Sequence, residues 1–276
     1  MSEQRLNPIP GPAEPSLPGE VSPRSAKPEK ERDIFGREPV GYPDWSHRRG
    51  EPRVFALIWM LFLMGVTILM FSAFMNALSI SPSITRPAAR SMIVATTLGI
   101  VAFWPALRLS QQPSDRPIRA VFRDMFVILV PAQAVIWPHA LSALASWPLI
   151  LLLAIAASMG AWALVIGGVI AIGDSTRQRV SGSWWMLAIL AIAGFFPLYA
   201  TLTGTLGIVR PDVPRLGWMF SPLTSMLELT RSRDEMGHPT PVYPGHWRLI
   251  GATACFGLAL LILARACDVA SRRRNP

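Results

Sequence analysis

Six long apolar segments separated by short polar stretches occupy the chain beyond residue 53, at 54–80, 91–107, 125–145, 148–172, 184–209 and 249–264. A helix needs about 20 apolar residues to cross roughly 30 Å of hydrocarbon. Lipid offers no hydrogen-bond partner to an open backbone, so only helices or closed barrels cross it. The sequence therefore predicts an all-α membrane protein, a six-span helical bundle over residues 54–270.

The third and fourth segments are separated only by Ser146 and Trp147, so one long broken helix is an alternative to two spans. The 48 residues from 125 to 172 are far more than one crossing needs. Pro148 is also well suited to the first turn of a new helix. We therefore expect a hairpin at this point.

Composition supports the membrane class, because 51% of residues are hydrophobic, 16% are charged and the mean hydropathy is +0.37. Residues 1–32 are rich in proline and mixed charge and contain no aromatic residue, so they are predicted to form a disordered tail. The final residues, 271–276, form a basic cytoplasmic tail in this prediction.

Residues 33–53 differ from the tail, because aromatic residues appear among glycine, proline and charge. One interpretation is a juxtamembrane collar, with rings at the headgroup level and arginines on anionic lipid. The other is a docking motif for a cytoplasmic partner. The candidate contact residues of this collar are Phe35, Tyr42, Trp45, Arg48, Arg49 and Arg53.

The arginines indicate the orientation of the bundle. With the N-terminus inside, 14 arginines fall on the cytoplasmic side and 7 on the other. This bias predicts that both termini are cytoplasmic, in the inner (plasma) membrane of a bacterium. The arginines lie in small groups between apolar runs, not in one stripe on a soluble face, so we expect lipid partners and no nucleic acid.

No motif in the sequence indicates an enzyme. HExxH, CxxC, phosphate-loop and GxSxG patterns do not occur, so we expect no catalysis and no cofactor or metal. Each carboxylate beyond residue 53 falls in a predicted loop or at a span end, and Arg108 is expected to snorkel toward water. We predict that no carboxylate pair and no histidine–carboxylate pair meets inside the hydrocarbon zone.

The fourth segment carries small residues at helical spacing, Ala163, Gly167 and Ala171, which permit close backbone approach. This span is expected to lie centrally in the bundle or at a subunit contact. Prolines 105, 131, 138 and 197 should bend or interrupt their spans and leave carbonyl groups that need other donors.

The last external loop, residues 210–246, contains a predicted short amphipathic helix on or in the outer leaflet. Ser221 suits its N-cap and Pro222 its first position. Glu228 is expected to face water or to pair with Arg231. The apolar residues at helical spacing in this helix include Leu223, Met226 and Leu227.

Six spans, a broken external element and the stretch SPLTSMLEL before the last helix resemble the permease subunits of six-helix ABC-type exporters, mainly over residues 184–270. The resemblance implies a dimer, a separate ATPase chain and substrate movement without an intramembrane charge. Two features depart from it. The collar replaces an amphipathic helix before the first span, and the cytoplasmic coupling segment is reduced to LSQQPSDRPIRAVFRD, with Arg116 and Arg119 as candidate contacts.

The sequence therefore leaves two functions open. In one, the chain is a permease-like membrane subunit of a transport complex. In the other, it is a non-transporting membrane scaffold or assembly factor that docks a partner through residues 33–53.

Overall fold

The computed structural model describes residues 52–72, 81–111, 114, 116–176, 181–204, 213–233 and 238–274. The predicted tail, the collar residues Phe35, Tyr42, Trp45, Arg48 and Arg49, and the side chain of Arg53 lie outside these described residues. Predictions made for them stay predictions.

The described residues form a helical chain, as predicted. Its elements are α1 (Pro52–Ser72), α2 (Pro82–Leu98), η2 (Gly99–Phe103), α3 (Trp104–Ser110), α4 (Pro117–Ile136), η3 (Trp137–Ala140), α5 (Leu149–Thr176), α6 (Gly182–Leu202), η4 (Leu216–Phe220), α7 (Pro222–Leu229) and α8 (Pro244–Arg274). Six stretches are long and apolar enough to cross a membrane, namely Val54–Ser72, Pro82–Ser110, Pro117–Ala140, Leu149–Thr176, Gly182–Leu202 and Pro244–Ala270. The six predicted spans are confirmed.

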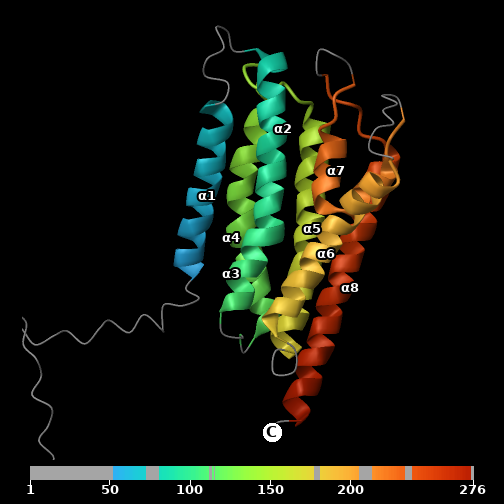
Figure 1. Ribbon diagram of the computed structural model, residues 1–276. Helices are drawn as coiled ribbons and strands as arrows, with labels where there is room; N and C mark the ends of the chain where they lie inside the picture. The colour runs from blue at the N-terminus through green and yellow to red at the C-terminus, as the bar shows by residue number, and fades with distance from the viewer. Residues whose placement is uncertain are drawn as a thin grey trace, which may run out of the picture. The chain divides into compact units, whose positions relative to one another are not determined.

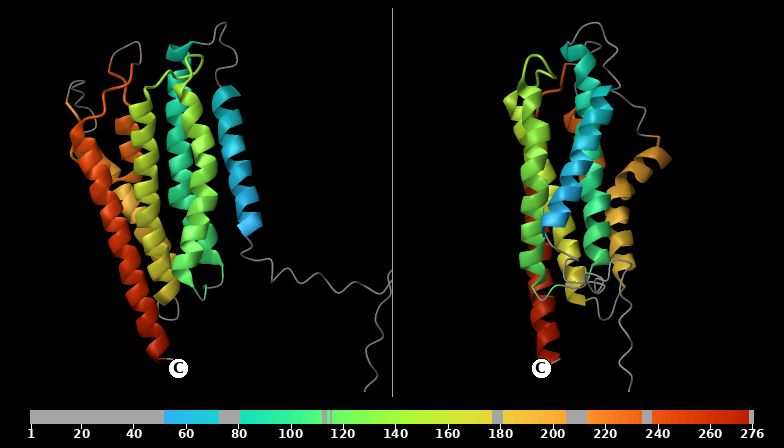
Figure 2. Two further views of the ribbon diagram at one scale, coloured as in Figure 1. Left: turned by 180° about the vertical axis from the view of Figure 1, so that it is seen from behind. Right: turned by 90° about the vertical axis from the view of Figure 1, so that its left-hand side faces the viewer.

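The start of α1 and the end of α8 lie at the same end of the bundle, the lower end in Figure 1. The short helix α7 lies at the upper end, beside α2 and α5. Helix α5 is central, because it packs against α4, α6, α7 and most extensively α8. Figure 2 shows α1 at one side of the bundle, where it packs on α2 and α4.

Glycines allow α5 and α8 to approach closely. A Cβ added at Gly168 of α5 would lie 2.6 Å from Leu260 Cβ, and one at Gly257 of α8 would lie 2.7 Å from Leu164 Cβ. The other face of α5 carries Gly167, where an added Cβ would lie 2.7 Å from Val121. Ala163 and Ala171, on the predicted small-residue stripe, are fully buried.

Turns and prolines separate the spans. The predicted hairpin between the third and fourth spans is present, and Ser146 adopts a left-handed φ of 52° at its turn. Pro105 follows the π-helix η2, which replaces the regular hydrogen-bond ladder in the middle of the second span. Helix α6 contains Pro197 and bends toward its C-terminal end (Figure 2, right).

The second and sixth spans begin earlier than predicted, at Pro82 and Pro244 instead of 91 and 249. Arg86 and Arg90 precede the predicted second span, and His246 and Arg248 precede the sixth, so hydropathy alone placed all four outside the helices. Within the bundle, Arg86 donates to the Ala145 carbonyl at 3.0 Å. This hydrogen bond satisfies the Arg86 side chain inside the bundle, so the helix can begin before the apolar segment does.

Candidate functional site

A cluster of charged residues lies at the upper end of the bundle, and we call it the α7-end cluster. Glu228 is at its centre. One carboxylate oxygen, Oε1, lies 3.5 Å from Arg231 Nη2 and 3.8 Å from His246 Nε2, and it accepts a hydrogen bond from the Arg215 backbone N–H at 3.0 Å. Arg90 reaches the same helix, where its Nη2 donates to the Leu227 carbonyl at 3.3 Å.

The centre of this cluster is shielded from solvent. Glu228 is 1% exposed, His246 2% and Arg231 6%. Burial raises the pKa of Glu228 above its usual range, because the ionised carboxylate loses solvation, while the Arg215 N–H and the nearby arginine charges oppose that rise. Burying such charges is costly, so they are retained in membrane proteins mainly where they serve a function.

Polar contacts with α6 and η4 hold α7 in place. Pro197 has no N–H, so it leaves the Ala193 carbonyl of α6 without its helical donor. The Ser221 hydroxyl donates to that carbonyl at 2.6 Å instead of capping α7. The Thr224 hydroxyl donates to the Trp218 carbonyl of η4, also at 2.6 Å.

The predicted short helix is confirmed as α7, and its placement on or in the outer leaflet stays a prediction. Helix α7 packs against α2, α5 and α6, and its Ser221, Pro222, Met226 and Glu228 are buried while Leu223 and Leu227 are half-buried. The apolar face was visible in the sequence. The partners of the polar face were not, because they lie on η4, α6 and α8.

Arg90 and Arg215 form the half-buried edge of the α7-end cluster. Both contact α7 at neighbouring positions, Arg90 through the Leu227 carbonyl and Arg215 through its backbone N–H to Glu228. The Arg215 guanidinium lies over the Trp218 ring, 4.8 Å from its centroid. The Nε atoms of both arginines are buried, and neither has a hydrogen-bond partner. This edge therefore presents donors that an anion could satisfy.

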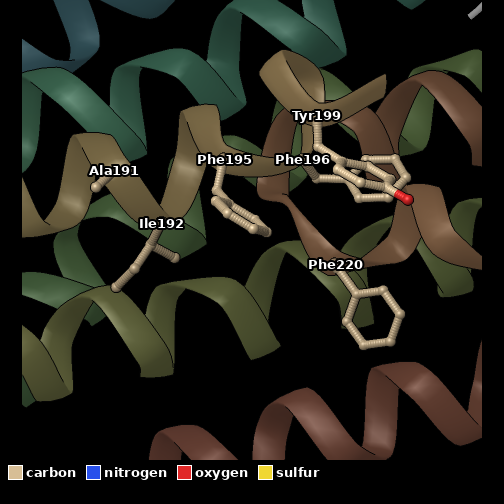
Figure 3. A pocket seen from close by; sticks show the side chains of 6 residues that line it. All are labelled: Ala191, Ile192, Phe195, Phe196, Tyr199 and Phe220. Carbon is tan, nitrogen blue, oxygen red and sulfur yellow. The ribbon is translucent and has the colours of Figure 1, made fainter. Parts of the chain in front are cut away.

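An apolar groove of about 600 Å³ lies beside the same short helix, η4. Figure 3 shows aromatic side chains of α6 and Phe220 of η4 around this space. Phe195 and Phe220 are 71% and 62% exposed, so the groove opens to the surroundings of the bundle. Its lining residues are Ala191, Ile192, Phe195, Phe196, Tyr199 and Phe220.

A second buried set of charges, the Arg108 cluster, lies at the lower end. Arg108 of α3 meets Asp124 of α4, with Nε 3.6 Å from Oδ2, and Asp174 of α5, with Nη2 3.3 Å from Oδ2. All three residues are buried. The expectation that Arg108 snorkels is wrong, since its guanidinium pairs inward and ties three helices together.

The prediction that no two carboxylates and no histidine–carboxylate pair meet inside the hydrocarbon zone stays a prediction, because the contacts of the two clusters are described by burial within the bundle and not by depth in a membrane. Asp124 and Asp174 share one guanidinium, and Glu228 meets His246, so both kinds of contact occur among buried residues. The sequence interpretation placed these carboxylates in loops or at span ends. It did not predict that Arg108, Asp124 and Asp174 meet, because they lie on three different helices and are far apart in the sequence.

The predicted cytoplasmic contacts Arg116 and Arg119 are exposed at the start of α4. They lie one to two helical turns before Asp124, so the Arg108 cluster holds the helix that carries them. His139, at the other end of this span, is buried beside Trp147, with 5.4 Å between ring centroids. Within the described ranges, no three histidine, cysteine, aspartate or glutamate side chains gather as metal ligands.

The fold and the two buried clusters define a polytopic α-helical membrane protein. Comparison with protein-family models, with curated proteins and with solved structures finds no match for this chain. The resemblance to exporter permeases thus has no independent support from these comparisons, and a proposal for function depends on the residues and their geometry.

Proposed function

We propose that this chain is a permease-like membrane subunit of a transport complex that is driven by a separate ATPase chain. The observation that carries the proposal is the placement of α7. This helix lies between the fifth and sixth spans in the sequence and packs inside the bundle with a buried, charged centre. A helical anchor for a scaffold has no need of such a centre, which is costly in a membrane.

The lower end of the bundle offers a surface for the partner. Arg116 and Arg119 are exposed there, and they can attract an acidic surface on a soluble protein. The Arg108 cluster, which includes Asp124 on the same helix, joins α4 to α3 and α5. A force applied to the start of α4 would therefore reach the central helix through packed side chains.

The test is purification of the tagged full chain from its native membrane in a mild detergent. The expected result is a stoichiometric partner that carries a phosphate loop and hydrolyses ATP in the isolated complex. The double variant Arg116→Glu/Arg119→Glu should lose most of this partner because it reverses the surface charge. The control is Arg248→Glu, which reverses an exposed arginine at the other end of the bundle.

Recovery of stoichiometric partners without any ATPase would overturn the proposal and favour the scaffold. Equal loss of the ATPase in the double variant and in the Arg248→Glu control would refute the docking surface. Thermal unfolding of the three proteins separates lost docking from lost folding.

A further inference from the structure

The α7-end cluster contains two guanidinium groups whose charge the described carboxylates do not neutralise by direct contact. Among residues 52–274 that the structure describes, no carboxylate makes an ion pair with Arg90 or Arg215. Each has a buried Nε with no acceptor. Two like charges at close range in a poorly solvated place raise each other's energy, and an anion between them would lower it.

Glu228 does not fill this role, although its charge reaches Arg90. Its Oε1 is engaged by Arg231, His246 and the Arg215 backbone N–H, and its Oε2 is buried and makes no hydrogen bond to either arginine. The guanidinium groups of Arg90 and Arg215 stay outside that contact, and both residues are half-buried, so part of each side chain is accessible to a ligand. The planar guanidinium fork matches the oxygens of phosphate or carboxylate.

The apolar groove is connected to Arg215 through the short helix η4. Arg215 precedes the first residue of η4, and Phe220 ends it, so about 10 Å of 3₁₀-helix separates the cation from the groove lining. Gly217 between them lies against Phe196, since a Cβ added there would be 3.1 Å from the ring. A ligand with a polar head and an apolar tail can therefore bind with its head near Arg215 and its tail along η4 and α6.

We propose that Arg90 and Arg215 bind the phosphate of an anionic phospholipid whose acyl chain lies in the groove of α6 and η4. Charge complementarity selects the head, and the exposed aromatic lining selects the tail. The space of about 600 Å³ is within the roughly 300–1,000 Å³ of ordinary ligand sites. Basic sites between membrane helices recognise lipid headgroups by the same physics.

A second apolar groove provides an internal comparison. It encloses about 320 Å³ on α4 and includes Phe126, Val130 and Gln133. The Gln133 amide is satisfied, because Nε2 donates to the Leu129 carbonyl and Oε1 accepts from the Trp137 indole. Its lining is apolar apart from Gln133, so a variant that fills it is a control for the groove of α6 and η4.

The experiment is native mass spectrometry of the purified full chain in detergent, titrated with phosphatidylglycerol and, separately, with phosphatidylcholine of the same acyl chains. The wild type should retain one phosphatidylglycerol with on the order of tenfold preference over phosphatidylcholine. Arg90→Gln/Arg215→Gln should abolish the preference, and Arg90→Lys/Arg215→Lys should keep most of it. Arg248→Gln, an exposed arginine at the same end, is the charge control and should match the wild type.

The groove is tested with a variant that fills it. Ala191→Phe should weaken retention of phosphatidylglycerol on the order of tenfold without a change of charge. Val130→Phe on α4 is the matched control and should have no effect on headgroup preference. Excess inorganic phosphate should fail to displace the bound lipid, because it has no tail for the groove.

Three outcomes would overturn the proposal: an undiminished preference in Arg90→Gln/Arg215→Gln, unchanged retention in Ala191→Phe, or displacement of the lipid by inorganic phosphate, which would indicate an anion site without a tail subsite. The measurement uses this chain without any ATPase. Its failure is therefore distinct from a failure to find the ATPase partner.

Discussion

The two buried clusters of this protein use similar side chains but differ in charge balance. In the Arg108 cluster, one guanidinium lies between Asp124 and Asp174, and the half-exposed Arg123 adds a weak contact of 3.9 Å to Asp124. In the α7-end cluster, Arg90 and Arg215 contact α7 beside Glu228, whose Oε1 is engaged by Arg231 and the Arg215 backbone N–H and makes no ion pair with either guanidinium.

This difference separates a structural cluster from a binding cluster. Buried charges that neutralise one another by direct contact fix the helices that carry them and leave little to attract a ligand. Buried charges of one sign near a half-exposed edge attract counter-ions. Substitutions at the Arg108 cluster should therefore reduce stability, whereas substitutions at Arg90 and Arg215 should change binding more than stability.

The largest expected effect comes from Arg108→Ala. This variant removes the guanidinium that Asp124 and Asp174 share, and breaking a buried ion pair from one side costs about 3–5 kcal/mol. The measurement is the free energy of unfolding of the purified protein in detergent. Arg123→Ala is the control, because its side chain is 48% exposed and such pairs contribute about 0–1 kcal/mol. Equal losses in the two variants would contradict the structural role of this cluster.

A smaller loss is expected from Gly257→Ala, which separates the helices that link the two clusters, since α5 carries Asp174 and α8 carries His246. The new Cβ would lie 2.8 Å from the backbone of Leu164, and overpacking of this kind costs about 1–3 kcal/mol. Gly251→Ala on the same helix is the control, because nothing lies within 4 Å of its Cβ position. A stable Gly257→Ala protein would show that the two helices can move apart freely.

The six spans could be predicted from the sequence, whereas the two buried clusters could not. Hydropathy is a local property, so six helices, the hairpin at Ser146 and the short helix at Pro222 followed from neighbouring residues alone. Whether Arg90 or Asp124 faces water or a partner depends on residues far along the chain. The Arg90 contact to Leu227 spans 137 residues, and the Arg108 contact to Asp174 spans 66.

One local signal for α7 was present but incomplete. Pro197 predicts an unpaired carbonyl four residues earlier, and a nearby hydroxyl is a natural donor. The sequence has several hydroxyl groups in the following loop, so it does not single out Ser221, which the fold brings to the Ala193 carbonyl. The groove likewise needs α6 and η4 to be adjacent, which no local pattern indicates.

The smallest predicted effect is a pH dependence that belongs to the α7-end cluster, and Glu228→Gln tests it. The folded protein holds the pKa of Glu228 above its ordinary value of 4.5, mainly by burial, so it binds the proton more tightly than the unfolded chain does. Stability contributed by this group should therefore fall as the pH rises from about 4.5 through the raised pKa, by about 1.4 kcal/mol per unit of pKa difference.

The amide of Glu228→Gln still accepts the Arg215 N–H but does not ionise, so the variant should lack this fall. The measurement is the difference in unfolding free energy between wild type and variant from pH 4 to pH 8, in which the other carboxylates cancel. A wild type that gains stability relative to the variant as the pH rises would show that attraction to Arg231 outweighs burial. The α7-end cluster would then resemble the charge-paired Arg108 cluster more closely than its geometry indicates.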